Sequence, residues 1–190
     1  MTELSGVALP GPSILLREFR TGDVDDAFRV VGDERVTKFL SFDSRSYKQA
    51  AAMISAAVAR TSDNPRSEYY LAVATPDKDR LVGFIRLALG GVAAAKLGYA
   101  VAADHWGKGY ATEAVQIMLK FAFERLELHR VTAAIGPDND ASLAVVRKIG
   151  FLAEGRLRDH VFTNGAWRDS LLYSLLSDDF LVATDRAHNR

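Results

Sequence analysis

The chain has 190 residues, of which 48% are hydrophobic and 25% charged, as in an ordinary soluble globular protein. Its 24 basic and 24 acidic side chains balance, so no overall basic field favours nucleic acid and we expect no nucleic-acid partner. Cysteine is absent, which excludes disulfides, cysteine–zinc sites and a cysteine nucleophile. No signal-peptide pattern or membrane-length apolar run is present, so we expect a cytoplasmic protein without membrane contact.

The first half of the chain is predicted to form one strand, two helices and three strands. Residues 1–12, with two glycines and two prolines, are expected to be a loose tail. Turn signals and apolar spacing then place a strand at 14–19, a helix after Asp23, a helix at about 46–60, and strands at 69–74, 81–89 and 95–102. Because no helix separates these last three strands, they should be antiparallel.

The second half centres on an amphipathic helix at 111–127, whose apolar residues recur at helical spacing. A buried strand at 131–135 follows, and the intervening helix makes it parallel to strand 95–102. A short helix ends at Gly150, and Asn164-Gly165 is a hairpin turn between strands 159–163 and 166–176. We therefore predict one α/β domain over 1–190 with a mixed sheet and a second loose tail at 178–190.

A glycine-rich loop comes directly before the long helix and has the sequence Trp106-Gly107-Lys108-Gly109-Tyr110-Ala111-Thr112. The unpaired N–H groups of a helix N-terminus, next to glycines, suit a phosphate group. Thr112 replaces the third glycine of a dinucleotide fingerprint, and no Gly-Lys-Ser/Thr of a Walker loop is present. Lys108 is either a charge contact to the ligand or a solvated lysine.

A second turn, Asn139-Asp140-Ala141-Ser142, opens the short helix. These residue types are typical helix caps, and one of them would be enough for that purpose. Asn139 and Ser142 are three residues apart, so both could also face a ligand that lies along the helix. The residues alone leave these two interpretations open.

Together the two motifs resemble those of the GNAT N-acetyltransferases. The loop 106–114 is similar to the acetyl-CoA loop of that family, and its first position is Trp106 where the wider family has Gln or Arg. The later series Asn139, Ser142, Gly150-Phe151 and Glu154-Gly155 resembles the RimJ/RimL branch, whose best-known members acetylate N-termini of ribosomal proteins. The resemblance implies a GNAT fold with about seven mostly antiparallel strands, about four helices and a splayed central parallel pair.

The resemblance also implies how acetyl-CoA would be held. Residues 106–112 would bind the diphosphate, and Asn139 would bond the pantetheine arm in the gap between strands 95–102 and 131–135. Main-chain groups near Tyr99, Ala100 and Val101 would hold the acetyl carbonyl, as a preorganised oxyanion site does. Ser142 would lie near the sulfur. No metal is expected to take part.

Two catalytic groups are predicted on the same grounds. Many family members have a tyrosine seven residues after the Asn as the acid for the leaving thiolate; here that position is Val146, and Ser142 is the replacement. A base must deprotonate the acceptor ammonium, and Glu154 is the first choice, with an ion pair to Arg156 or Arg158 as the alternative. The other candidate bases are Asp104, His105, Glu113 and Asp159.

The sequence thus predicts direct acetyl transfer from acetyl-CoA to a primary amine in a ternary complex. A protein N-terminus is the preferred acceptor. A small amine such as a polyamine or antibiotic, and a non-catalytic acyl-CoA-binding module, are the alternatives. The predicted partner is a peptide or small-amine substrate, and the chain is a monomer or a homodimer.

Overall fold

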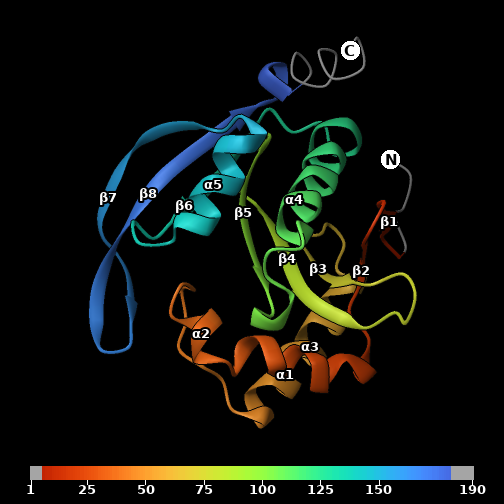
Figure 1. Ribbon diagram of the computed structural model, residues 1–190. Coiled ribbons are helices and arrows are strands. Elements are labelled where there is room, and N and C mark those ends of the chain that lie inside the picture. The colour runs from red at the N-terminus through yellow and green to blue at the C-terminus, as the bar shows by residue number, and fades with distance from the viewer. Residues whose placement is uncertain (1–5, 181–190) are drawn as a thin grey trace.

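The computed structural model describes residues 6–180 and contains one eight-stranded sheet with the order β1-β2-β3-β4-β5-β6-β8-β7 (Figure 1). Every neighbouring pair is antiparallel except β5 and β6, which are parallel. The strands are β1 Ala8–Pro10, β2 Leu15–Glu18, β3 Glu68–Ala74, β4 Leu81–Leu89, β5 Ala94–Val101, β6 Arg130–Ile135, β7 Leu152–Thr163 and β8 Ala166–Leu176.

Helices cover both faces of this sheet (Figure 1). Successive side chains of a strand point to opposite faces, and β3 shows the division: Leu71 packs into the core with α4 and α5, whereas Ala72 packs with α1 and α3. The helices are α1 Val24–Val31, α2 Glu34–Thr37, α3 Tyr47–Ala59, α4 Tyr110–Lys120 and α5 Asp140–Ile149. Short 3₁₀ turns lie at Thr21–Asp23, Arg60–Ser62 and Ala103–His105, and a π-helix at Phe121–Arg125 continues α4.

The sheet of residues 6–180 is mostly antiparallel with one parallel pair, as expected, and has eight strands where about seven were expected. The expected N-terminal tail is wrong at Ala8–Pro10, which pairs with β2 as β1. The side chain of Glu113 on α4 accepts hydrogen bonds from the N–H groups of Ser13 (2.8 Å) and Ile14 (3.1 Å). This carboxylate therefore fastens the start of the chain to α4, which leaves it a structural role.

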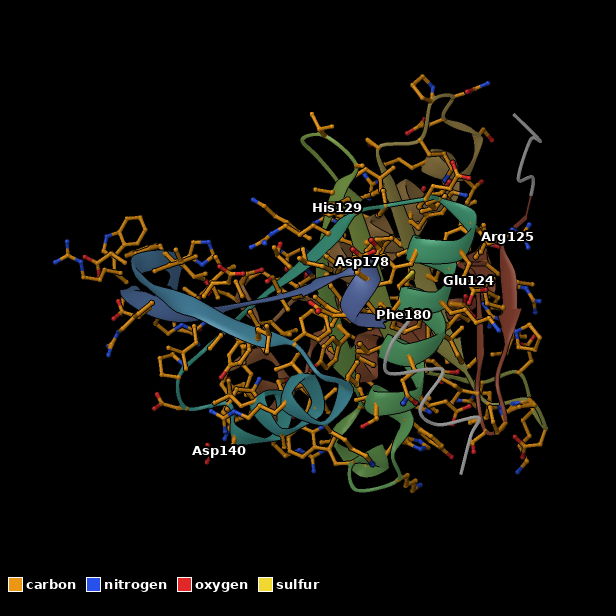
Figure 2. The ribbon with its side chains drawn as sticks, turned by 90° about the horizontal axis from the view of Figure 1, so that it is seen from above. Glu124, Arg125, His129, Asp140, Asp178 and Phe180 are labelled. Atoms are coloured by element: carbon orange, nitrogen blue, oxygen red, sulfur yellow. The ribbon has the colours of Figure 1, made fainter. Side chains whose placement is uncertain are left out.

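The expected C-terminal tail is also wrong at Phe180. Phe180 is buried and its ring lies 5.2 Å from that of Phe123, and Figure 2 shows the turn that carries Asp178 and Phe180 beside α4. Phe180 therefore packs in the core, whereas Asp178 and Asp179 are exposed. The rest of that predicted tail, 181–190, lies outside the described residues. An apolar side chain that pairs with a π-helix ring gave no periodic signal in the sequence.

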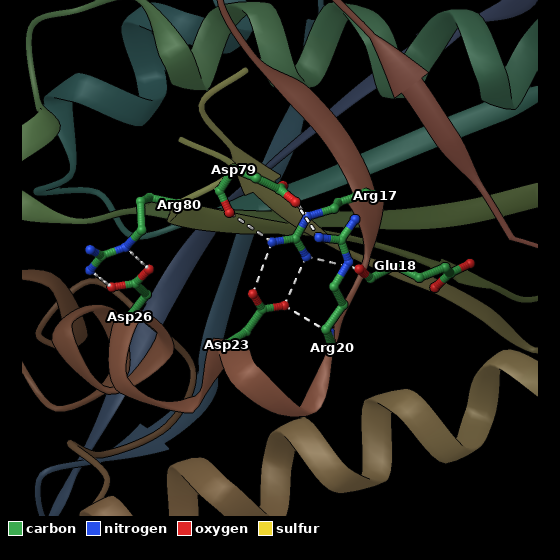
Figure 3. A network of polar contacts seen from close by, with 7 residues as sticks. All are labelled: Arg17, Glu18, Arg20, Asp23, Asp26, Asp79 and Arg80. Atoms are coloured by element: carbon green, nitrogen blue, oxygen red, sulfur yellow. Dashed lines mark hydrogen bonds and ion pairs between the residues drawn. The ribbon is translucent and has the colours of Figure 1, made fainter. Parts of the chain in front are cut away.

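An ionic network fixes α1 against the sheet (Figure 3). The guanidinium of Arg17 on β2 is buried and makes two hydrogen bonds to the carboxylate of Asp23, at 2.8 and 2.9 Å, and one to Asp79 at 2.7 Å. A nearby pair joins Arg80 to Asp26 of α1. A buried ion pair is stable only when its partners satisfy each other, so these contacts specify where α1, and the segment after it, meets β4.

The parallel pair opens toward its carboxyl end. Residues 94–97 of β5 pair with residues 130–133 of β6, and beyond Leu97 β5 has no partner on that side. From Ala134 onward β6 pairs only with β8. The predicted splay is therefore present, and it lies next to the N-termini of α4 and α5.

Candidate active site

A pocket of about 490 Å³ opens where the splayed strands meet the N-termini of α4 and α5. The segment before α3 covers it from the other side, through Phe39 and Leu40. It brings together most of the residues that the sequence singles out: Tyr99, Val101, Trp106, Gly107, Gly109, Tyr110, Ala111, Thr112, Asn139 and Ser142. Ala100 and Lys108 do not line it.

The glycine loop presents backbone donors to this pocket. Gly107 and Gly109 have φ values of +76° and +81°, a left-handed conformation that side chains disfavour. The Glu113 N–H donates to the Gly109 carbonyl at 3.0 Å, so the N–H groups of Tyr110, Ala111 and Thr112 come before the first intrahelical bond and have no helical acceptor. A Cβ at either glycine would meet no atom within 4 Å. The loop thus has free donors and the room that a diphosphate requires.

Trp106 anchors the loop to β5. Its indole Nε1 donates to the carbonyl of Val101 at 2.8 Å. The substitution of Trp for Gln or Arg at this position therefore replaces a possible ligand contact by a bond that fixes the loop against the strand.

The open edge of β5 offers main-chain groups to the pocket. The Ala102 N–H bonds the Val82 carbonyl of the β4 side at 2.8 Å, and N–H directions alternate along a strand. Ala100 therefore also faces β4, while Tyr99 and Val101 face the splay. Trp106 occupies the Val101 carbonyl, which leaves the N–H groups of Tyr99 and Val101 as the donors for an acyl oxygen.

The start of α5 serves as both cap and pocket wall. The Asn139 side chain accepts a hydrogen bond from the Ser142 N–H at 3.1 Å, so it caps the helix, and both residues line the pocket. The Tyr99 hydroxyl lies 3.4 Å from the Ser142 carbonyl oxygen, to which it donates. Burial raises the pKa of Tyr99 to about 12, so this phenol keeps its proton at neutral pH. The hydroxyl of Ser142 has no partner within residues 6–180.

The predicted acid and base positions differ in their surroundings. Val146 has an aliphatic side chain that is fully buried in the core, so this position offers no acid. Glu154 does not line the pocket; it accepts from Ser174 and from Arg130 (3.0 Å) near the far end of β6. These hydrogen bonds, that of Ser174 foremost, lower the pKa of Glu154. The ion pair that the sequence left open is therefore present, but with Arg130.

Lys108 and His105, both in the loop before α4, contact each other. The Lys108 Nζ lies 3.3 Å from Nδ1 of His105. Burial lowers the pKa of His105, and the charge of Lys108 lowers it further, so a neutral imidazole can accept from the lysine. His105 lines the pocket at its loop end. Asp104 pairs with Arg35 at 3.2 Å.

The segment that roofs the pocket is held in place by the β7–β8 hairpin. Arg168 on β8 donates to the carbonyls of Lys38 and Leu40, and the Asn164 N–H donates to the Asp43 carboxylate at 2.7 Å. The long β7–β8 hairpin thereby holds the 38–43 segment in place. Asp138, which precedes the cap, lines both this pocket and a neighbouring one beneath the hairpin. These contacts join residues more than 100 positions apart, and no local pattern signals them.

A splayed parallel pair next to a glycine-rich helix N-terminus is the arrangement that the resemblance to acetyl-CoA-dependent acetyltransferases implied. Comparison with known proteins agrees: a family model described as an acetyltransferase (GNAT) domain matches residues 13–152. The chain therefore belongs to the GNAT acetyltransferase family.

Relatives fall in the branch that the motifs resemble. The probable N-acetyltransferase YjcK of Bacillus subtilis is 38% identical over 115 residues, 59% of this chain and 64% of that protein. The ribosomal protein uS5-alanine N-acetyltransferase of Escherichia coli is 29% identical over 60% of each chain. Both of these matches span less than two thirds of the relative's length. The structure of Mycobacterium smegmatis RimJ in complex with CoA-disulfide superposes with a TM-score of 0.77 and 25% identity, over 95% of this chain and 94% of that one.

Within residues 6–180 no helix is long and apolar enough to cross a bilayer. The same residues contain no cluster of three or more metal-ligating side chains.

Proposed function

We propose that this protein transfers the acetyl group of acetyl-CoA to the amino terminus of a peptide. The observation that carries the proposal is the convergence of three elements on one pocket: the glycine-loop N–H groups, the open edge of β5, and the start of α5. The first would bind the diphosphate, and the second the thioester oxygen. The third would bind the pantetheine arm through Asn139.

The reaction would be a direct transfer. The amine nitrogen attacks the thioester carbon, the C–S bond breaks, and the sulfur leaves as a thiolate that takes up the proton which the attacking nitrogen loses as the amide forms. The Tyr99 and Val101 N–H groups would stabilise the negative charge that develops on the acyl oxygen. No cysteine is available for an acyl-enzyme, which supports a ternary complex.

Two hydroxyls would serve the leaving sulfur. Ser142 has a free hydroxyl in the pocket, and the protonated Tyr99 phenol reaches the same turn of α5. We propose that both donate hydrogen bonds to the developing thiolate, for which the Tyr99 hydroxyl gives up its bond to the Ser142 carbonyl. Glu154 is paired with Arg130 outside the pocket. We therefore propose Asp138 as the base that takes the proton of the acceptor ammonium before attack, because its carboxylate is exposed and lines the pocket.

The test is thiol release from acetyl-CoA with a panel of peptides, polyamines and aminoglycosides, followed by mass spectrometry of the products. The proposal expects turnover with peptides that have a free amino terminus, and none when that terminus is blocked. Turnover with a small amine but with no peptide would show that the acceptor is a small amine and not a peptide amino terminus. CoA binding without any turnover would indicate a binding module. Treatment with a chelator should leave the rate unchanged, because the protein side chains supply the proton transfers.

A further inference from the structure

A second pocket, of about 600 Å³, lies on the sheet face covered by α3, opposite α4. β3, β4, β5, α3 and the segment before α3 enclose it. Tyr99 and Leu40 line both this pocket and the glycine-loop pocket. The two spaces therefore meet at the strand where the thioester would lie.

This second pocket is basic although the chain as a whole is neutral. Arg45, Arg60 and Arg86 line it, and the only carboxylate among its lining residues is that of Glu68. Glu68 is buried and pairs with Arg60 at 2.7 Å and with Arg86 at 2.5 Å. One negative charge thus faces three positive charges, and the excess is available to an anion.

Arg45 is the arginine without a carboxylate. Its guanidinium lies over the ring of Phe42, at 4.5 Å from the centroid, and within residues 6–180 it makes no ion pair or side-chain hydrogen bond. A contact with an aromatic face leaves the in-plane N–H donors free. Such a fork matches the two oxygens of a carboxylate. The stacking would also hold the guanidinium in place before a ligand arrives.

Gly98 leaves β5 without a side chain beside the second pocket. Side chains alternate along β5, where Leu97 packs on the α4 face and Ala100 on the α3 face. A side chain at Gly98 would thus point into the second pocket, and a Cβ there would meet nothing within 4 Å. The strand is therefore bare at the point where an acceptor would pass toward Tyr99.

We propose that Arg45 binds a carboxylate of the acceptor, so that the preferred substrate is a peptide whose amino terminus is followed by an acidic residue. This inference rests on the proposed function. The second pocket would take the acidic side chain while the amine reaches the thioester beside Tyr99. The excess positive charge would disfavour polyamines and other polycationic acceptors.

The experiment compares two hexapeptides that share a free N-terminal serine and differ only by Glu or Gln at positions two and three. The expected kcat/KM of the wild type is at least about tenfold higher for the Glu peptide, as for a charge-assisted pair. In Arg45→Met this preference should vanish while the affinity for CoA stays unchanged. Arg125→Met is the matched control, because Arg125 is exposed at the end of the π-helix that continues α4 and lines neither pocket.

Equal kcat/KM values for the two peptides in the wild type would overturn the inference and leave the proposed function intact. A preference that survives Arg45→Met would overturn the role of Arg45. Absence of turnover with either peptide, despite CoA binding, would instead refute the proposed function.

Gly98→Val tests the route independently. We expect it to raise the KM for the Glu peptide without changing the dissociation constant of CoA, which also verifies that the variant is folded. An unchanged KM would show that the acceptor does not pass Gly98.

Discussion

Replacing Gly109 by alanine should weaken CoA binding by more than it destabilises the protein. At φ +81° an alanine costs about 1–2 kcal/mol, and the absence of any atom within 4 Å of its Cβ adds no clash. The same strain would turn the N–H groups of Tyr110, Ala111 and Thr112 away from the diphosphate. A charge-assisted hydrogen bond is worth about 1.5–3 kcal/mol, so the loss of one raises Kd roughly 10- to 100-fold.

Isothermal titration with CoA and denaturant unfolding measure the two effects separately. Gly91→Ala is the matched control, because Gly91 has φ +71° and equally open surroundings but lies in the β4–β5 turn outside the pocket. Both variants should lose similar stability, and only Gly109→Ala should lose affinity. If Gly109→Ala binds CoA as tightly as Gly91→Ala does, the loop does not hold the diphosphate.

Three further predictions concern catalysis and pH. Tyr99→Phe and Ser142→Ala should each lower kcat roughly tenfold with CoA affinity kept, as stopped-flow thiol assays would detect; a wild-type kcat in both would remove the hydroxyls from the mechanism. Glu154→Gln should keep kcat/KM, and a pH–rate profile that loses its acidic limb in this variant would restore Glu154 as the base. The hydrogen bond from Arg17 holds the pKa of Asp79 below its usual value, so its contribution to stability is present above about pH 4 and is lost as the pH falls further. Asp79→Asn should therefore destabilise the protein at neutral pH and have little effect in acid, and an equal loss in acid would contradict this.

The order of strands and helices was predictable because it depends on short-range signals. The periodicity of 111–127 predicted α4, and Asn164-Gly165 predicted the β7–β8 turn. The pattern predicted neither the π-helix at Phe121–Arg125 nor the ring contact between Phe123 and Phe180, which is a tertiary one. β1 was missed because three residues among glycines and prolines carry little strand signal.

In the functional site, too, local motifs were predictable and contacts between distant residues were not. The glycine loop and the Asn139 cap are local motifs, and the structure brings both to one pocket. Roles that depend on distant partners were not accessible. Glu154 stands in a sequence pattern typical of the branch, yet its environment is set by Arg130 and Ser174, which are 24 and 20 residues away. Likewise, Arg45 has no motif of its own, and only the fold places it near β5.

Amide NMR during titration with acetyl-CoA would show which backbone groups contact the ligand. We expect the largest shift changes at the N–H groups of residues 107–112, Tyr99 and Val101, with Ser142 and Asn139 next. Ala100, which faces β4, should change less than its two neighbours. Changes confined to other surfaces, with the signals of the glycine loop and of the β5 edge unmoved at saturation, would contradict the assignment of this pocket to acetyl-CoA.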